Sequence, residues 1–396
     1  MNREFDINTP QKTAQRSPAN PLVVGIIYFI LTLYLPIALF ADISSEILGA
    51  ISIAAAAFAV IGLYSIIKSA RPVVSFAMTF GIILIFLSSI VCGIAAAFIG
   101  SVYLLSYLLI SSKKTSGRFF ALAVSPVSYL LCAALLGNFT TALIAIIHLP
   151  AALVLTYCFS RKIDRISTIC RTSCAILLSF GALFAAAFFM AHGTDLEALR
   201  ALIESVRTSA TDFLANTLYT VYSQIPEMSM SMTDALEFST TAVNTVFNLL
   251  PAIVIISSNI VAFFLQSTMT TILIQGETDK AKIRYMVAFD MSLISAIVFL
   301  AAFLVTAILS EKMSVWSVTA ENIAMILIPG LAFTALIALR QLIFSKKPSC
   351  FGALTYLLSI IVLFYIPAVM LSLYAFAGAV VIILNNIAKH KLKKKN

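Results

Sequence analysis

Long apolar runs separated by short polar segments organise this chain, and the length of each run predicts how often it crosses a membrane. A helix needs about 20 mainly apolar residues to span the hydrocarbon layer of a bilayer. Runs of that length predict single spans at residues 22–41, 48–67, 172–191, 243–274, 286–309 and 322–344. Three longer runs predict hairpins of two spans each: 73–112, turning near 88–91; 119–159, turning near Asn138; and 351–387, turning near Pro367.

This pattern predicts an all-α protein, a polytopic transmembrane helical bundle of about twelve spans in one membrane domain. Composition points the same way, because 61% of the residues are hydrophobic, only 11% are charged, and the mean hydropathy is +1.03. Soluble domains are about 45–50% apolar and 25% charged. The composition therefore excludes a soluble protein.

One polar insert interrupts the apolar pattern, at residues 193–242. Between Gly193 and Ile225 its apolar positions recur in steps of three and four, which predicts an extracytoplasmic amphipathic helix. These positions are Leu196, Leu199, Ile203, Val206, Ala210, Phe213 and Thr217. Thr194 and Glu197 have the spacing of a capping box at its start. Because the insert is acidic, we expect it to fold back over the membrane domain rather than to bind anionic lipid.

The basic residues lie mostly on one side of the predicted topology. Of the 26 Lys and Arg residues, 23 fall in the termini or in loops on the same side, and only Arg200, Arg207 and Lys312 fall opposite. Loops rich in Lys and Arg stay in the cytoplasm. We therefore expect a multi-pass protein of the bacterial cell membrane with both termini cytoplasmic, and we attribute the net charge of +9 to topology rather than to nucleic-acid binding. The predicted parts are a cytoplasmic tail (1–21), a first group of membrane helices (22–192), the insert (193–242), a second group of membrane helices (243–388) and a basic cytoplasmic tail (389–396).

A row of amides follows one face of the predicted span at 243–274. At about 100° per residue, this face carries Asn244, Asn248, Asn259, Gln266 and Thr270. Lipid offers no hydrogen bonds, so the row must meet protein or water. The amides serve either as hydrogen bonds between helices or as the lining of a site for a small polar ligand.

Three further polar residues stand in or beside apolar runs. Asp290 is the only carboxylate inside such a run, which makes it either a proton or ligand site or an interfacial partner of Lys282 and Arg284. Asn322 opens its span and is a further candidate ligand contact. His148 is isolated in the sequence, and we interpret it as a packing residue.

The chain shows no motif for catalysis. It has no Gly-rich phosphate-binding loop, no His-Glu-x-x-His pair and no paired intramembrane acids. Cys170 and Cys174 share a helical face without a His or an acidic ligand beside them, so we expect no metal and no cofactor. We expect the protein not to be an enzyme. Gly93 and Gly181 belong to small-residue patterns that predict close helix packing.

The second half has a distinctive order of parts, across roughly residues 140–390. The order is HLPAALVLTYCFSRK, the amphipathic insert, LLPAIVIISSNIVAFFL, FDMSLISAIVFLAAFLV, ENIAMILIPGLAF and YAFAGAVVIIL. It resembles the YybS-like family of bacterial membrane proteins, which implies no catalytic residues. The layout of that family is similar to the small-molecule-capturing membrane subunits of energy-coupling-factor transporters.

Two functions from different classes follow. The first is a membrane component that binds or transports a small polar ligand through Asn244, Asn248, Asn259, Gln266, Asp290 and Asn322. Transport would draw on an ion gradient, with Asp290 as the proton site, or on a separate ATPase bound to the basic loops. The alternative is a non-enzymatic scaffold that partners a membrane protein of envelope assembly. A major facilitator is disfavoured, because the loop after the second predicted span, KSARP, lacks the Asp and glycines typical of that class.

Overall fold

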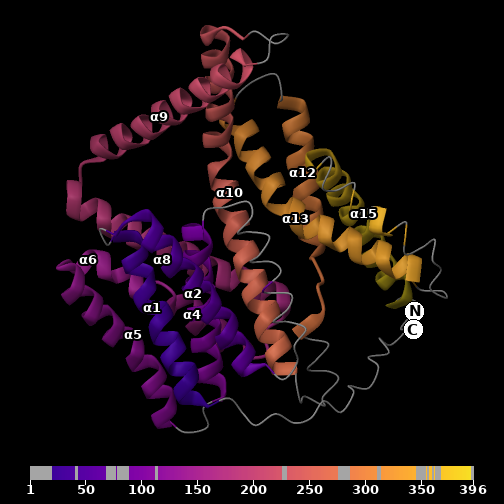
Figure 1. Ribbon diagram of the computed structural model, residues 1–396. Coiled ribbons are helices and arrows are strands. Elements are labelled where there is room, and N and C mark those ends of the chain that lie inside the picture. Colours follow the sequence, from indigo (N-terminus) through magenta and orange to yellow (C-terminus); the bar gives the residue numbers. More distant parts are fainter. Residues whose placement is uncertain are drawn as a thin grey trace. The chain divides into compact units, whose positions relative to one another are not determined.

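The computed structural model describes residues 20–40, 43–67, 77, 89–111, 115–224, 230–274, 286–309, 314–344, 354, 356–358, 361 and 367–393. Within these ranges every regular element is a helix and none is a strand (Figure 1). Nine helical stretches are long and apolar enough to cross a membrane, and one shorter apolar helix accompanies them in the described ranges. The prediction of an all-α polytopic membrane protein is therefore confirmed.

The helices follow the predicted spans closely. In chain order they are α1 (Pro21–Phe40), α2 (Ser45–Ile66), α4 (Ser89–Ser111), α5 (Thr115–Leu136), α6 (Phe139–Ala142), the 3-10 helix η1 (Leu143–Ile146), α7 (Leu149–Ser160), α8 (Arg165–His192), α9 (Leu196–Ser223), α10 (Met232–Ile274), α12 (Leu293–Leu309), α13 (Val315–Phe344) and α15 (Pro367–Lys393). The first span predicted in each of the hairpins 73–112 and 351–387 lies largely outside the described residues.

Three helices begin well before their predicted spans, because a polar cap and not the apolar boundary sets the start of each. Helix α8 begins after Asp164, whose Oδ2 accepts a hydrogen bond from Ser167 N at 2.9 Å. At the start of α10, Asp234 N donates to Ser231 Oγ at 3.1 Å. Helix α13 follows Ser314, whose Oγ accepts from the backbone one turn later. Such side chains satisfy the free N–H groups of the first turn.

Helix α9 confirms the amphipathic helix predicted for the insert, but its cap was assigned wrongly. Asp195, not Thr194, caps it, because Asp195 Oδ1 accepts from Glu197 N at 2.8 Å and from Ala198 N at 3.3 Å. The helix contacts α10 where the Arg207 guanidinium lies 5.2 Å from the centre of the Phe247 ring. Most of its predicted apolar stripe is exposed, with Phe213 75% exposed, whereas Leu199 and Ala210 are half-buried. That the insert folds back over the membrane domain stays a prediction.

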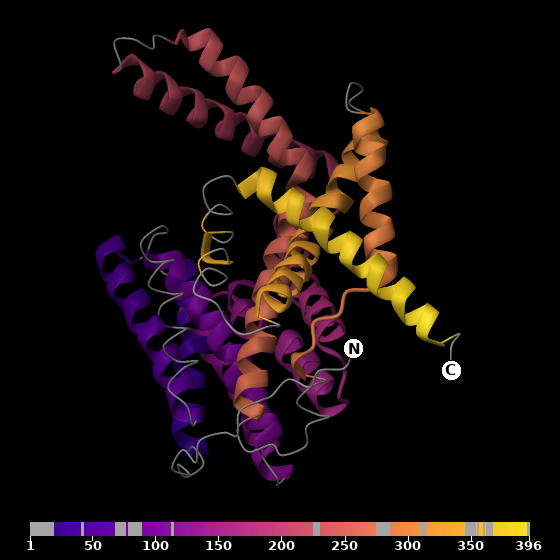
Figure 2. The same ribbon diagram turned by 90° about the vertical axis from the view of Figure 1, so that its right-hand side faces the viewer.

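The chain divides into two compact units, residues 1–191 with 258–288 and residues 192–257 with 289–396. In the first unit, α1, α2 and α4 pack against one another (Figure 2). Gly93 allows this packing, since a Cβ there would lie 2.7 Å from the Ser52 Cβ. Close packing was also predicted at Gly181, but among the described residues no atom lies within 4 Å of its Cβ position.

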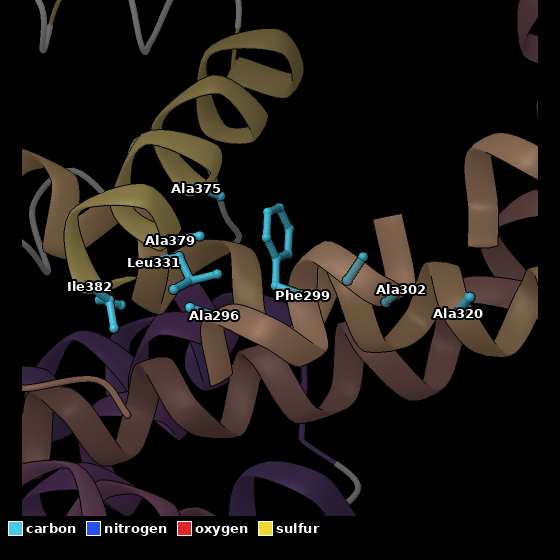
Figure 3. Packing of buried hydrophobic residues seen from close by; sticks show 9 residues of the cluster. Ala296, Phe299, Ala302, Ala320, Leu331, Ala375, Ala379 and Ile382 are labelled. Atoms are coloured by element: carbon cyan, nitrogen blue, oxygen red, sulfur yellow. The ribbon is translucent and has the colours of Figure 1, made fainter. Parts of the chain in front are cut away.

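The second unit has a core of small residues between α12, α13 and α15 (Figure 3). Its buried members are Ala296, Phe299, Ala302, Ala320, Ala324, Leu331, Ala375, Ala379 and Ile382. Alanine-rich faces let helix backbones approach closely in a membrane. The approach is closest at Gly378, where a Cβ would overlap the backbone carbonyl group of Leu331.

Candidate functional site

The span after α5 changes helical geometry along its length, while the backbone at Ala142, Leu143, Ile147 and His148 keeps right-handed helical dihedral angles. Gly137, at φ +64°, turns the chain after α5, and Asn138 caps α6 by accepting from Thr140 N at 2.8 Å. This turn confirms the prediction of a hairpin turning near Asn138. After one turn of α6 the chain tightens into η1, and α7 begins only at Leu149.

The change of geometry lies near the middle of the 22-residue apolar stretch Phe139–Ser160, and its local cause is Pro150. Proline has no N–H and its ring would collide with the carbonyl of the residue four before it, so it is tolerated in the first turn of a helix and not in the interior. Pro150 accordingly sits in the first turn of α7. His148 occupies the junction between η1 and α7.

His148 is fully buried and contacts α1. Its Nε2 lies 2.6 Å from the Oη of Tyr28 on α1, and the two rings meet edge to face with centres 5.3 Å apart. The same Tyr28 Oη also hydrogen bonds to the Oγ of Ser125 on α5. Tyr28 and Ser125 are fully buried too. We call these three residues the helix-break site.

The second ring nitrogen of His148 is not bonded to Tyr28 or Ser125. Nδ1 of His148 is buried and has no partner of normal hydrogen-bond geometry in the described part of the chain, although the backbone of Ala145, one turn earlier, interacts with the ring. Leaving a buried polar group unsatisfied costs about 1–3 kcal/mol. Such a group in a native protein needs an explanation, and a functional role or a bound water is the usual one.

A second polar contact extends the site along α1 and α5. One turn beyond Tyr28, Thr32 Oγ1 lies 2.8 Å from Ser128 Oγ. Each hydroxyl also lies within hydrogen-bond distance of a carbonyl of its own helix, Phe29 O for Thr32 and Val124 O for Ser128, so one hydroxyl donates to its carbonyl while the other donates across the contact. The seam between α1 and α5 is therefore polar over two successive contacts in an otherwise apolar bundle.

The first unit contains a matched pair of groups without a histidine. Tyr34 Oη on α1 lies 2.6 Å from Ser52 Oγ on α2, and Ser52 Oγ donates to Leu48 O. Ser52, like Ser125, is fully buried. This pair shows what a tyrosine and a serine do as packing groups alone, and it provides a natural control for the helix-break site.

Gln266 of the predicted amide row is held by protein groups in the first unit. It is 1% exposed; its Nε2 donates to Thr270 Oγ1 at 2.8 Å and to Met286 O at 3.1 Å. Its Oε1 accepts from Arg165 Nε at 3.0 Å. Arg165 also donates to Ser267 and to Val287 O, and its guanidinium lies 4.9 Å from the Phe263 ring centre. The sequence had given Arg165 only a topological role.

Within the second unit, the Asn322 side chain bonds to two backbone groups of α10. Its Nδ2 donates to Asn248 O at 2.8 Å and to Val318 O at 2.9 Å, and its Oδ1 accepts from Ala252 N at 3.0 Å. Asn248 O and Ala252 N are the acceptor and donor of one helical turn, and Pro251 lies in that turn. A side chain from a neighbouring helix can satisfy backbone groups freed by proline in a membrane.

Asp290 lies outside its predicted helix. It is exposed and precedes α12, which begins at Leu293. Ser292 caps that helix, since Ser295 N donates to Ser292 Oγ at 3.1 Å. The predicted start of the span at Met286 was therefore wrong, because the cap at Ser292 begins α12 and residues 286–291 do not join it. An ion pair with Lys282 or Arg284 lies outside the described residues.

The remaining amides, Asn244, Asn248 and Asn259, are half-buried on α10. Asn244 and Asn248 belong to the second unit, whereas Asn259 belongs to the first. Their role as ligand contacts stays a prediction, as does that of Gln266, Asp290 and Asn322.

Sequence reasoning missed the importance of His148, although one signal was available. A histidine two residues before a proline in the middle of an apolar run marks both a helix break and a polar group placed at it. Within the described ranges no three His, Cys, Asp or Glu residues gather as a metal site. Comparisons with protein-family models, curated proteins and solved structures found no match to this chain.

Proposed function

We propose that the protein is a membrane component that binds and transports a small polar solute, and that the helix-break site lies on the solute's path. The observation that carries the proposal is the buried imidazole of His148, which is bonded to Tyr28 and lies in mid-span where the helix changes from 3-10 to α geometry. Broken membrane helices are typical of transporters, which bind substrates and ions near the bilayer midplane. Ionisable residues inside membrane spans are usually functional.

Energetics favour a functional role for these groups over a packing role. A hydrogen bond between membrane helices contributes about 0.6 kcal/mol on average. The unsatisfied Nδ1 of His148 costs about 1–3 kcal/mol. The two contacts of Tyr28, together about 1.2 kcal/mol, reach only the lower end of that cost. A site that adds so little stability is better explained by binding.

The chemistry of the site suggests the class of solute. Two hydroxyls and an imidazole provide both donors and acceptors and no permanent charge. We propose an uncharged or zwitterionic polar solute. Because the chain has no nucleotide-binding motif, transport would be driven by an ion gradient or by a separate ATPase at the basic loops.

Thermal stabilisation of the purified full-length protein across a panel of polar metabolites tests the proposal. A ligand of the site should raise the melting temperature of the wild type and lose that effect in Tyr28→Phe. Tyr34→Phe removes a tyrosine hydroxyl from another position of α1, away from the site, and this variant should still be stabilised by the ligand. Asn248→Leu and Asn259→Leu test the amide row in the same assay. If no metabolite stabilises the wild type, or if both tyrosine variants respond equally, the proposal fails.

A scaffold remains the second candidate, and helix α9 is the observation in its favour. Ile203, Val206 and Phe213 are 45%, 53% and 75% exposed along one stripe of this helix. Exposed apolar stripes mark contact surfaces for proteins or membranes. Crosslinking from this stripe in intact cells would support a scaffold if it recovers one stoichiometric membrane-protein partner. Crosslinks only to lipid or to this chain would count against it.

A further inference from the structure

We infer that Ser125, Tyr28 and His148 form a proton-transfer chain in which the imidazole of His148 holds the proton. This inference rests on the proposed function for its location and goes beyond it by naming protons as the coupled ion. The basis is the sequence of hydrogen bonds, in which the Tyr28 hydroxyl lies between Ser125 Oγ and His148 Nε2 and contacts both.

The tyrosine hydroxyl has one hydrogen, so the three groups can be hydrogen-bonded in two opposite directions. In the first, Ser125 donates to Tyr28, and Tyr28 donates to an unprotonated Nε2. In the second, a protonated Nε2 donates to Tyr28, and Tyr28 donates to Ser125. Both fit the same heavy-atom positions, because either partner of each contact can be the donor.

Conversion between the two directions moves one proton. Tyr28 passes its hydrogen to Nε2 and takes the hydrogen of Ser125, and Ser125 takes a proton from water. The product is an imidazolium that carries hydrogens on both nitrogens. Release of the Nδ1 hydrogen to a base or water on the far side restores a neutral ring. The buried Nδ1, which has no partner of normal geometry, is the group free to make that exchange.

The surroundings leave His148 as the best proton acceptor in this part of the protein. Helices α1, α4, α5, α6, η1 and α7 contain no Asp or Glu. Their other ionisable groups near mid-span are cysteine thiols and tyrosines, and from α4 the Tyr103 hydroxyl is tied to Ala59 O. Arg118 and Arg161 stand at the ends of α5 and α7. Histidine is the side chain that ordinarily changes charge between pH 5 and 8.

Nitrogen NMR of the full-length protein in liposomes tests the inference directly. His192 and His390 are replaced by Gln, so that ring-labelled histidine reports on His148 alone. Titration from alkaline to acidic pH should convert a neutral ring into an imidazolium with hydrogens on both nitrogens. In Tyr28→Phe the conversion should be lost or slowed, whereas Tyr34→Phe should behave as the wild type.

A ring that stays in one neutral tautomer at every pH in the folded wild type would overturn the inference, whether or not Tyr28→Phe folds. Equal behaviour of the two tyrosine variants would overturn it as well. The NMR titration and the metabolite panel test different claims and can fail independently. A solute that stabilises the wild type while His148 never protonates would leave solute binding standing and remove proton coupling.

Discussion

Two polar sites, one in each unit, use buried side chains in different ways. In the first, Tyr28, Ser125 and His148 bond to one another and still leave a ring nitrogen without a normal partner. In the second, Asn322 satisfies three backbone groups, and the core around it is largely alanine. Asn322 thus repairs backbone, whereas Tyr28, Ser125 and His148 form a site whose hydrogen bonds are incomplete.

This difference indicates where to look for function. A polar residue whose bonds are all used by the fold, as with Asn322, is explained by stability. A buried ionisable group that remains incomplete in mid-span, as with His148, is a candidate for binding or exchange. The following predictions aim to break or sharpen that contrast, beginning with the largest effect.

Substitution of Gly378 should destabilise the second unit most. The Cβ of Gly378→Ala would overlap the Leu331 backbone carbonyl on α13, and backbone cannot move aside as a side chain can. We expect a loss of about 3 kcal/mol, the upper part of the range for overpacking. Gly181→Ala is the control, because its Cβ meets no atom within 4 Å. Thermal unfolding in detergent measures both, and equal melting temperatures would refute the close packing of α13 and α15.

Loss of the Asn322 amide should cost about 2 kcal/mol, because buried backbone groups at Asn248 and Ala252 lose their partner. The cost should shrink in a Pro251→Ala background, where α10 can close its own hydrogen bonds. A double-mutant cycle between Asn322→Ala and Pro251→Ala would measure this coupling in unfolding experiments. Additive effects would show that Asn322 does not act through the proline turn.

The smallest effect concerns Asp164, the cap of α8 in the first unit. Asp164→Ala should cost about 1 kcal/mol, as for other helix caps. Burial alone would raise the pKa of Asp164, but hydrogen bonds from Ser167 and the nearby charge of Arg171 hold that pKa below its ordinary value. Its folded pKa is therefore lower than its unfolded pKa, so the stabilisation is complete above about pH 4 and is lost as the pH falls further.

Asp164→Ser provides the control, since serine also caps helices but does not titrate. The stability difference between the wild type and Asp164→Ser should change only below about pH 4, where the wild type loses its advantage. Melting temperatures recorded between neutral pH and the acid limit of folding would show this. A constant difference across that range would mean that the carboxylate does not contribute through its charge.

The sequence predicted most of the architecture because membrane spans depend on apolar length, which is readable without knowledge of tertiary contacts. Helix starts were less predictable. Asp164, Ser231 and Ser314 each begin a helix in polar sequence, where the apolar pattern is silent. Asp195 displaced Thr194 as the cap of α9 for the same local reason.

The candidate site was harder to predict, because its members are far apart in the chain. Tyr28 and His148 are 120 residues apart, and helical periodicity relates only neighbours within one helix. Periodicity correctly selected Gln266 and Thr270 as one face, and they are bonded to each other. Periodicity could not show that Arg165, 101 residues from Gln266, would donate a hydrogen bond to the Gln266 amide oxygen.

Thiol accessibility tests most directly whether the helix-break site opens to water. In a variant without the six native cysteines, Ser125→Cys and Ser52→Cys compare two buried serines that each bond to a tyrosine of α1. A small water-soluble thiol reagent, applied to the protein in native membranes, should modify Ser125→Cys and leave Ser52→Cys unmodified. If both resist modification equally, Ser125 is packing like Ser52, and the account of a functional site in the first unit is wrong.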